Sequence, residues 1–308
     1  MDDVNREEPA LALKVPHTPA RIQAKGLSFL EFASKAEEAQ ALGALLSSLG
    51  FIHSADHVTL DLSLWTQGNI RILINRETKG YASSAFTLHG TNVCDIGIAV
   101  TDAQAAAERA KFLGADLFQQ PSDPKHLKIP AIHSQSSGIL HYIDDKNGLS
   151  DVWDVEFTAQ AKPAPGAGLT GVDHIGHTMN YEDMLSWSLF FTTLFDMKKS
   201  AMVDVVDPEG LVRSQALESS DGNLRITLNG AETHKTMAGS FLAESSNASV
   251  QHIAFATDDI FASAQRLEAS GFAPLPIANN YYADLAARFD IDDAMLERLR
   301  RHNILYDE

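Results

Sequence analysis

The sequence predicts an α+β protein made of two similar halves, in which a strand, a helix and several further strands recur. The first observation is a repeated octapeptide, GNIRILIN from Gly68 and GNLRITLN from Gly222, 154 positions apart. The second is a longer match without a gap, at an offset of 157, between VCDIGIAVTDAQAAAERAKFLG from Val93 and VQHIAFATDDIFASAQRLEASG from Val250. Solenoid repeats are much shorter than this. The pattern therefore indicates the duplication of a whole domain half.

Each half opens with an extended run, GLSFLEFAS from Gly26 and GVDHIGHTM from Gly171. Amphipathic helices are predicted over SKAEEAQALGALLSSLG and TDAQAAAERAKFLG, because a Ser or Thr-Asp start supplies an N-cap oxygen and a glycine ends each segment. Rough alternation predicts strands at HVTLDLSLW, NIRILIN, ILHYIDD and VWDVEFT. The Gly-Asn pair that opens the repeated octapeptide predicts a hairpin turn.

These elements predict four segments. Residues 1–24 read as a tail, 25–157 as the first half, 158–170 as a linker and 171–308 as the second half. The linker TAQAKPAPGAGLT is rich in Pro, Ala and Gly and has no periodicity.

Composition excludes several classes of protein. The 308 residues carry a formal charge of -17, which argues against nucleic-acid binding because phosphate contacts need clustered Lys and Arg. No uninterrupted apolar run is long enough to span a membrane, and the acidic N-terminus does not resemble a signal peptide. One cysteine, Cys94, excludes an internal disulfide and fits a reducing cytoplasm. Its apolar neighbours predict a small buried side chain.

The differences between the halves point to a site. His174 stands in the second half where the first has Phe29, and His252 stands where the first has Asp95. Two histidines at equivalent places on paired modules can converge on one metal ion, as in the 2-His-1-carboxylate sites of non-haem Fe(II) oxygenases. The alternative is that each histidine is an ordinary core residue, and for a lone histidine that is the commoner case. His177 falls on the opposite face of the strand from His174.

The segments VDHIGHT, RSQALES, LRITLN and VQHIAFATDDI resemble the second half of the 4-hydroxyphenylpyruvate dioxygenase family, in the vicinal oxygen chelate superfamily. GLSFLEFAS and LWTQGNIRILIN are similar to that family's metal-free first half. The resemblance covers about residues 25–308. It implies tandem βαβββ modules, with the third and fourth enclosing Fe(II), or another divalent ion such as Mg, Mn or Co.

The resemblance also implies roles for individual residues. His174 and His252 would be metal ligands, and Ser214, Asn229 and Gln251 would line the substrate pocket. The expected substrate is a small-molecule 2-oxo acid or another compound of aromatic metabolism.

Two departures from the family leave alternatives open. Asn229 is followed by GAETHK instead of Glu-Pro, and this feature is similar to the dioxygenase-like part of bacterial two-domain 3-dehydroshikimate dehydratases. The second reading is therefore a non-catalytic lobe of such a fusion, with a role in assembly or regulation. A third is another oxygen-chelate activity, such as ring cleavage or isomerisation.

The second departure concerns the third metal ligand, which in the family is a glutamate on a late strand of the fourth module. The sequence stops at Glu308 before such a strand, so the fourth module is expected to be incomplete. Asp307 or Glu308 could stand in only from a chain end. Unpaired sheet edges would favour a homo-oligomer.

Overall fold

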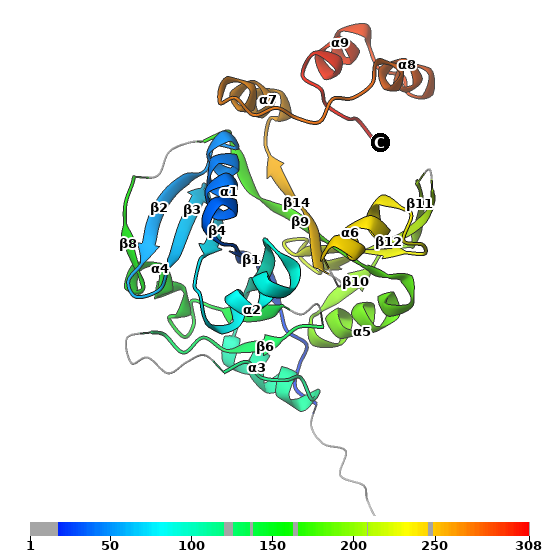
Figure 1. Ribbon diagram of the computed structural model, residues 1–308. Coiled ribbons are helices and arrows are strands. Elements are labelled where there is room, and N and C mark those ends of the chain that lie inside the picture. Colours follow the sequence, from blue (N-terminus) through cyan, green and yellow to red (C-terminus); the bar gives the residue numbers. More distant parts are fainter. Residues whose placement is uncertain are drawn as a thin grey trace, which may run out of the picture.

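The computed structural model describes residues 18–119, 126–135, 138–162, 166–207, 209–245 and 249–307 (Figure 1). Glu308, and most of the stretch expected to be a tail, lie outside these residues. The described chain forms two sheets, one from each half of the sequence, and each has helices packed against it. The predicted α+β class is confirmed.

The first half forms an eight-stranded sheet in the order β6-β7-β5-β1-β4-β3-β2-β8. Its strands are β1 (Ala24–Ala33), β2 (Ile52–His57), β3 (Leu62–Gln67), β4 (Ile70–Asn75), β5 (Asn92–Val100), β6 (Ala131–His133), β7 (Ile139–Ile143) and β8 (Phe157–Ala159). Its helices are α1 (Ala36–Ser48), α2 (Gly80–His89), α3 (Ala103–Phe112), the 3-10 turn Leu149–Asp151 and α4 (Val152–Val155).

The second half forms a six-stranded sheet in the order β10-β12-β13-β9-β14, with β11 also paired to β12. Its strands are β9 (Leu169–Asn180), β10 (Met197–Lys199), β11 (Val203–Asp207), β12 (Gly210–Ser219), β13 (Arg225–Ala231) and β14 (Ser249–Thr257). Its helices are the 3-10 turn Tyr181–Asp183, α5 (Met184–Leu194), α6 (Met237–Ser245), α7 (Ile260–Ala269), α8 (Asn279–Arg288) and α9 (Asp293–Arg301).

The two sheets share a central arrangement that follows the sequence repeat. The opening strand of each half, β1 or β9, pairs in parallel with β4 or β13 and antiparallel with β5 or β14. The Gly-Asn pairs of the repeated octapeptide lie between β3 and β4 and between β12 and β13, and Gly68 and Gly222 both have positive φ. The hairpin prediction is therefore confirmed in both halves.

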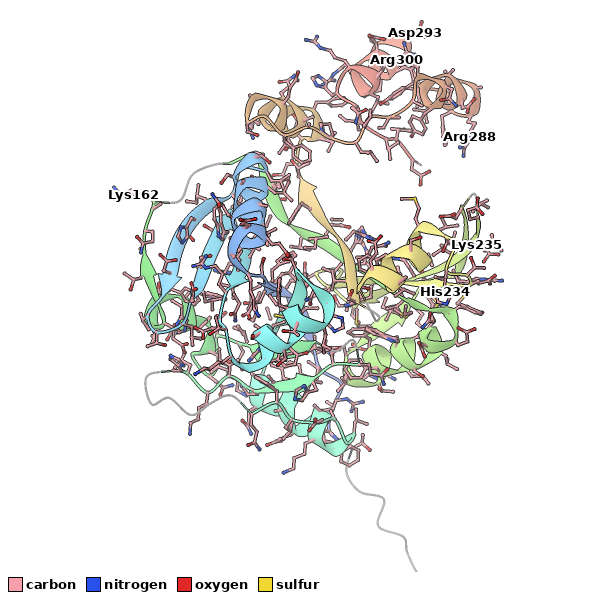
Figure 2. The ribbon with its side chains drawn as sticks, in the orientation of Figure 1. Lys162, His234, Lys235, Arg288, Asp293 and Arg300 are labelled. Carbon is pink, nitrogen blue, oxygen red and sulfur yellow. The ribbon has the colours of Figure 1, made fainter. Side chains whose placement is uncertain are left out.

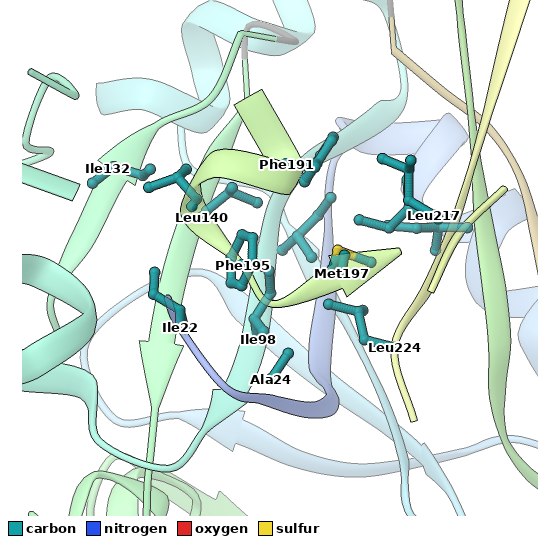
Figure 3. Packing of buried hydrophobic residues seen from close by; sticks show 14 of the residues in the cluster. Ile22, Ala24, Ile98, Ile132, Leu140, Phe191, Phe195, Met197, Leu217 and Leu224 are labelled. Atoms are coloured by element: carbon teal, nitrogen blue, oxygen red, sulfur yellow. The ribbon is translucent and has the colours of Figure 1, made fainter. Parts of the chain in front are cut away.

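The largest apolar core contains side chains from both halves (Figure 3). Because successive side chains alternate across a strand, Leu30 and Ile175 point into this core while Phe29 and His174 point to the opposite face. From the first half the core takes Ile22, Ala24, Ile98, Ile132 and Leu140, and from the second half Phe191, Phe195, Met197, Leu217 and Leu224.

Two helix contacts repeat this relation between the halves. Arg109 of α3 is buried and donates to the carbonyls of Thr193 and Leu194 at the C-terminus of α5. On the other side, Ser270, just after α7, donates to the carbonyl of Ser48 at the C-terminus of α1. In both places a helix of one half meets the end of a helix in the other half, as a pseudo-twofold relation requires.

Helices α8 and α9 lie away from both sheets (Figures 1 and 2). Tyr282, Leu285 and Leu299 form a small core of their own between α8 and α9. Figure 2 shows Arg288, Asp293 and Arg300 on the outside of this group. In the described residues after β14 the chain forms helices only, where the first half has β6, β7 and β8.

Three local predictions were wrong. The strand predicted at residues 57–65 is broken by a turn after His57, and the preceding strand β2 was missed. The segment VWDVEFT begins as the helix α4, because Gly148 has positive φ and Asp144 caps the turn by accepting from the backbone N–H of Asn147. The first residues of α1 have no side-chain cap, whereas Asp102 does cap α3 by accepting from the N–H of Ala105.

Segment boundaries also shift. Ile22, assigned to the tail, is 5% exposed and bridges to Phe195, so ordered structure begins before residue 25. The stretch assigned to the linker includes the end of β8 and the start of β9, and Ala167 is buried within it. Across the described ranges, no helix combines the length and the apolar character needed to cross a membrane.

Candidate metal centre

His174 and His252 lie on adjacent strands, β9 and β14, and their imidazoles face one another. The two Nε2 atoms are 3.3 Å apart, and the rings meet edge to face. His252 is paired with Gly176, and a Cβ at Gly176 would lie 2.0 Å from Cε1 of His252. The missing side chain of Gly176 therefore makes the space in which the His252 ring lies.

Asp173 determines the tautomer of His174. Its Oδ2 lies 2.7 Å from Nδ1 of His174, and Arg225 holds the same carboxylate at 2.9 Å. The hydrogen bond from His174, together with Arg225, lowers the pKa of Asp173, so this carboxylate is ionised and accepts the proton of Nδ1. The lone pair of His174 is then at Nε2 and points toward His252. A carboxylate in this position is the usual outer partner of a metal-binding histidine.

The geometry of the pair fits one metal ion. Two nitrogen ligands about 2.1 Å from an ion, at an angle of about 90–110°, are separated by about 3.0–3.4 Å. The Nε2 atoms of His174 and His252 are within that interval. Partial desolvation of the imidazole and the neighbouring His174 lower the pKa of His252, which keeps this imidazole neutral near pH 7.

The three residues expected to line the pocket lie in one row beside the pair. Ser214 is paired with Asn229 across β12 and β13, and Asn229 is paired with Thr178 of β9. Gln251 is joined to this row because its Oε1 accepts a hydrogen bond of 2.9 Å from the Thr178 hydroxyl. The sheet register, with the hydrogen bond of Gln251 to Thr178, places all five predicted site residues on the same face.

His177 lies on the other face of β9, as the alternation predicts. It is 1% exposed and stacks against Phe191 of α5, with ring centroids 5.8 Å apart. Among the described residues, neither ring nitrogen has a hydrogen-bond partner, and burial lowers the pKa of His177 to about 3. His177 is therefore a neutral core residue and cannot reach the histidine pair.

The structure brings together a second group that sequence reasoning missed. One ligand atom from each of His57, His126 and Glu156 lies within 4.8 Å of the others. Nδ1 of His57 accepts hydrogen bonds from the backbone N–H groups of Thr59 and Leu60, at 3.2 and 3.1 Å.

These bonds argue against a metal at His57. With Nδ1 accepting, the imidazole proton is on Nε2 and is donated to Glu156 at 3.1 Å. Metal binding at Nε2 would move the imidazole proton to Nδ1. The N–H groups of Thr59 and Leu60 would then have lost their acceptor and would face another N–H group. His57 and Glu156 therefore fix the turn after β2. The residues are 99 positions apart in the sequence, so no local spacing could have revealed the contact.

The equivalent centre of the first half has a different chemistry. Phe29 lies in the place of His174, over Gly97, and a Cβ there would be 2.2 Å from the ring. Asp95, in the place of His252, is bonded to His141 of β7 at 2.8 Å. Glu31 is paired with Asp95 across the strands, and burial together with Asp95 raises its pKa to about 7.

Comparison with known proteins agrees with this architecture. Residues 19–158 match the family model "Hydroxyphenylpyruvate dioxygenase, HPPD, N-terminal", and residues 171–297 match "Glyoxalase/Bleomycin resistance protein/Dioxygenase superfamily". A 4-hydroxyphenylpyruvate dioxygenase of Pseudomonas sp. (strain P.J. 874) is 30% identical over 92% of this chain and 80% of its own length. The chain belongs to the 4-hydroxyphenylpyruvate dioxygenase family. The resemblance seen in its motifs is thus confirmed.

Two other proteins similar to this chain are about twice its length. A 3-dehydroshikimate dehydratase of Pseudomonas aeruginosa is 36% identical over 92% of the chain, which spans only 44% of that protein. The solved structure of a xylose isomerase-like TIM barrel/4-hydroxyphenylpyruvate dioxygenase fusion protein is 34% identical, with a TM-score of 0.82 over 98% of this chain and 47% of the fusion. A 4-hydroxymandelate synthase variant from Streptomyces coelicolor, 20% identical with a TM-score of 0.77, shares the fold.

Proposed function

We propose that this chain is a non-haem Fe(II)-dependent oxygenase of the 4-hydroxyphenylpyruvate dioxygenase type, acting on a 2-oxo acid. The observation that carries the proposal is the 3.3 Å approach of the two Nε2 atoms of His174 and His252. The pair is accessible, because His252 is an exposed residue. Membership of the family supports the same reaction class.

His174 and His252 would hold the metal through Nε2. Two neutral imidazoles favour Fe(II) or Co(II) over Mg(II), which prefers oxygen ligands. Bound Fe(II) would supply a Lewis-acidic centre for the 2-oxo acid and the electrons for oxygen chemistry. Asp173 keeps the proton of His174 on Nδ1, away from the metal side. In the described part of the chain, no third His, Cys, Asp or Glu atom joins the two histidines within 4.8 Å.

The row Ser214, Asn229 and Gln251 would orient the substrate. Because Oε1 of Gln251 accepts the Thr178 proton, its amide NH2 group is left to donate. The Ser214 hydroxyl and the Asn229 amide add two further donors in the same row. Such donors suit a carboxylate and a keto oxygen, and they hold these groups in place without titrating near pH 7.

A calorimetric titration with Co(II) under anaerobic conditions tests the proposed centre. We expect one ion per chain, with an affinity at least about 100-fold weaker in His174→Ala and His252→Ala, because each loses a ligand nitrogen. His234→Ala is the matched control, since this histidine is exposed and lies outside the site (Figure 2). Equal binding by all variants would place the ion elsewhere.

Turnover is the second arm of the test. With Fe(II) and aryl 2-oxo acids, oxygen uptake and release of carbon dioxide should occur together and should be absent from His252→Ala. If tight Co(II) binding were lost when the protein is diluted to a monomer, a third metal ligand would come from a second copy of the chain in a homo-oligomer. A reducing cytoplasm, in which the single thiol stays free, is the proposed compartment.

A second candidate function is a non-catalytic lobe of a dehydratase fusion. The 36% identity to a 3-dehydroshikimate dehydratase and the sequence GAETHK after Asn229 favour it. It predicts that the chain binds Co(II) weakly or not at all and turns over no 2-oxo acid. The two titration results separate the candidates.

A further inference from the structure

Thr227 of β13 has a buried hydroxyl without a hydrogen-bond partner among the described residues. The side chain is half-buried, but its Oγ1 is fully covered. An unpaired buried hydroxyl costs about 1–3 kcal/mol. Its position is therefore informative about a partner that becomes available in the working protein.

The sheet register places Thr227 beside His252. Thr227 is paired with Ala216 on one side and with Gly176 on the other, and Gly176 is paired with His252. These residues form one row on the same face. Because Gly176 has no side chain, the His252 ring occupies the space above it, with Nδ1 and Nε2 each 2.5 Å from the place of a Cβ. Adjacent strands are about 4.8 Å apart, so Thr227 borders that ring.

The tautomers of the pair require a partner that can change roles. His174 donates from Nδ1 to Asp173, so the proton in the 3.3 Å contact belongs to Nε2 of His252. Nδ1 of His252 then carries a lone pair and needs a donor. When an ion binds Nε2, the proton moves to Nδ1, which then needs an acceptor. A hydroxyl group can be either.

Resting on the metal site proposed above, we propose that the Thr227 hydroxyl accepts a hydrogen bond from His252 Nδ1–H once an ion binds Nε2, and so positions this imidazole on the metal. Thr227 would thus serve His252 as Asp173 serves His174. A second hydroxyl on this face, on Thr178, lies in the next row, paired with Asn229, and already donates to Gln251 Oε1 at 2.9 Å. Thr227 is a positioning residue and does not touch the reacting atoms.

The test compares Co(II) affinity and the visible absorption of bound Co(II) in wild type, Thr227→Val, Thr227→Ser and Thr178→Val. Loss of an outer partner typically weakens metal binding about 10–100-fold. We expect this loss, with an altered Co(II) spectrum, in Thr227→Val. Thr227→Ser should restore both, and Thr178→Val should bind like wild type. Wild-type affinity in Thr227→Val, or an equal loss in Thr178→Val, would overturn the assignment.

Nitrogen-15 NMR of the His252 ring in the protein loaded with diamagnetic Zn(II) gives an independent readout. Thr227→Val should move the Nδ1–H resonance toward that of a donor without an acceptor, and Thr227→Ser should not. An unchanged Nδ1–H resonance would reject the role of Thr227. If wild type itself failed to bind Co(II), the proposed metal centre would fall, whereas tight binding by wild type and an unchanged Thr227→Val would reject the role of Thr227 alone.

Discussion

The centres of the two halves are built on equivalent strands, β1 and β5 in the first half and β9 and β14 in the second. They differ in whether their polar side chains are accessible to solvent. In the second half the pair His174 and His252 is accessible, and the described residues leave β14 at the edge of its sheet. In the first half β7 pairs with the equivalent strand β5, and its His141 closes on Asp95. Phe29 fills the space that His174 has in the other half. One fold thus supports an open ligand pair in one copy and a closed, buried network in the other.

The glycines beneath the two centres offer the strongest test of this difference. We expect Gly97→Ala to lower the free energy of unfolding by about 1–3 kcal/mol, because the new Cβ would lie 2.2 Å from the buried Phe29 ring. Phe29 has little free space to move into, since Trp153 and His141 pack against it, with ring centroids at 5.7 and 6.1 Å. Chemical denaturation measures the effect. A stability loss below 0.5 kcal/mol, roughly the limit for a neutral surface change, would mean that the first centre is not tightly filled.

An alanine in place of Gly176, the glycine under the His252 ring on β9, should affect binding more than stability. Gly176→Ala pushes the His252 ring from its place, but this ring can turn toward solvent. We expect Co(II) affinity to fall at least about tenfold, since ligand geometry tolerates only small errors. Gly171→Ala is the control, because nothing lies within 4 Å of its added Cβ. Unchanged affinity in Gly176→Ala would argue against His252 as a ligand.

The closed centre should make stability depend on pH. Burial and Asp95 raise the pKa of Glu31 from 4.5 to about 7, so the folded state holds this proton more tightly than the unfolded state. Its contribution is full below pH 4.5 and is lost as the pH rises through 7. Glu31→Gln should flatten this decline and stabilise the protein at pH 8 by roughly 1–2 kcal/mol relative to wild type.

Urea titrations at pH 5 and pH 8 measure that difference. Cys94→Ala serves as the control, because it alters a neighbour of Glu31 without removing a carboxylate. Identical pH dependence in Glu31→Gln and wild type would show that Glu31 is ionised in the fold.

A substitution at His177, in the second half, should change the free energy of unfolding by a smaller amount. His177 stands where the first half has Phe32, and neither of its buried nitrogens has a hydrogen-bond partner in the part of the chain that the structure describes. His177→Phe should raise the free energy of unfolding by about 1 kcal/mol at pH 7, because unsatisfied polar atoms are removed. The gain should grow toward pH 5, since protonation of the unfolded histidine no longer favours unfolding. A loss of stability would instead indicate that the larger ring is overpacked.

A histidine introduced into the first half should leave metal binding unchanged. Phe29→His places an imidazole in the first half at the position of His174, yet we expect no Co(II) binding there. His141 already bonds Asp95 through Nδ1, and Phe29 itself is buried in an apolar cluster. Tight binding of a second ion by this variant would show that sequence equivalence alone is enough to create the site.

The fold could be predicted from the segments that the two halves share. The site could be predicted from the residues in which the halves differ. His174, His252, Ser214, Asn229 and Gln251 could be chosen because motif and repeat agreed. The strand register, and for Gln251 its hydrogen bond to Thr178, places them on one face.

Other features depended on contacts between distant residues. The His57–Glu156 pair spans 99 positions, and Thr227 becomes notable only when its neighbours Ala216 and Gly176 are known. Helix α4 was misread as a strand because alternation in VWDVEFT outweighed the turn signal of the preceding Gly148. The intervening helices α2 and α6 were missed altogether.

The shared core of Figure 3 has a consequence for how the chain holds together. Ile22 of the first half donates its N–H to the carbonyl of Leu194, and Arg109 is bonded to the same end of α5. A protease that cut between the halves would therefore release no fragment, since each piece completes the other's interior. The nicked protein would behave as a tight heterodimer and would melt in one step, as an obligate complex does.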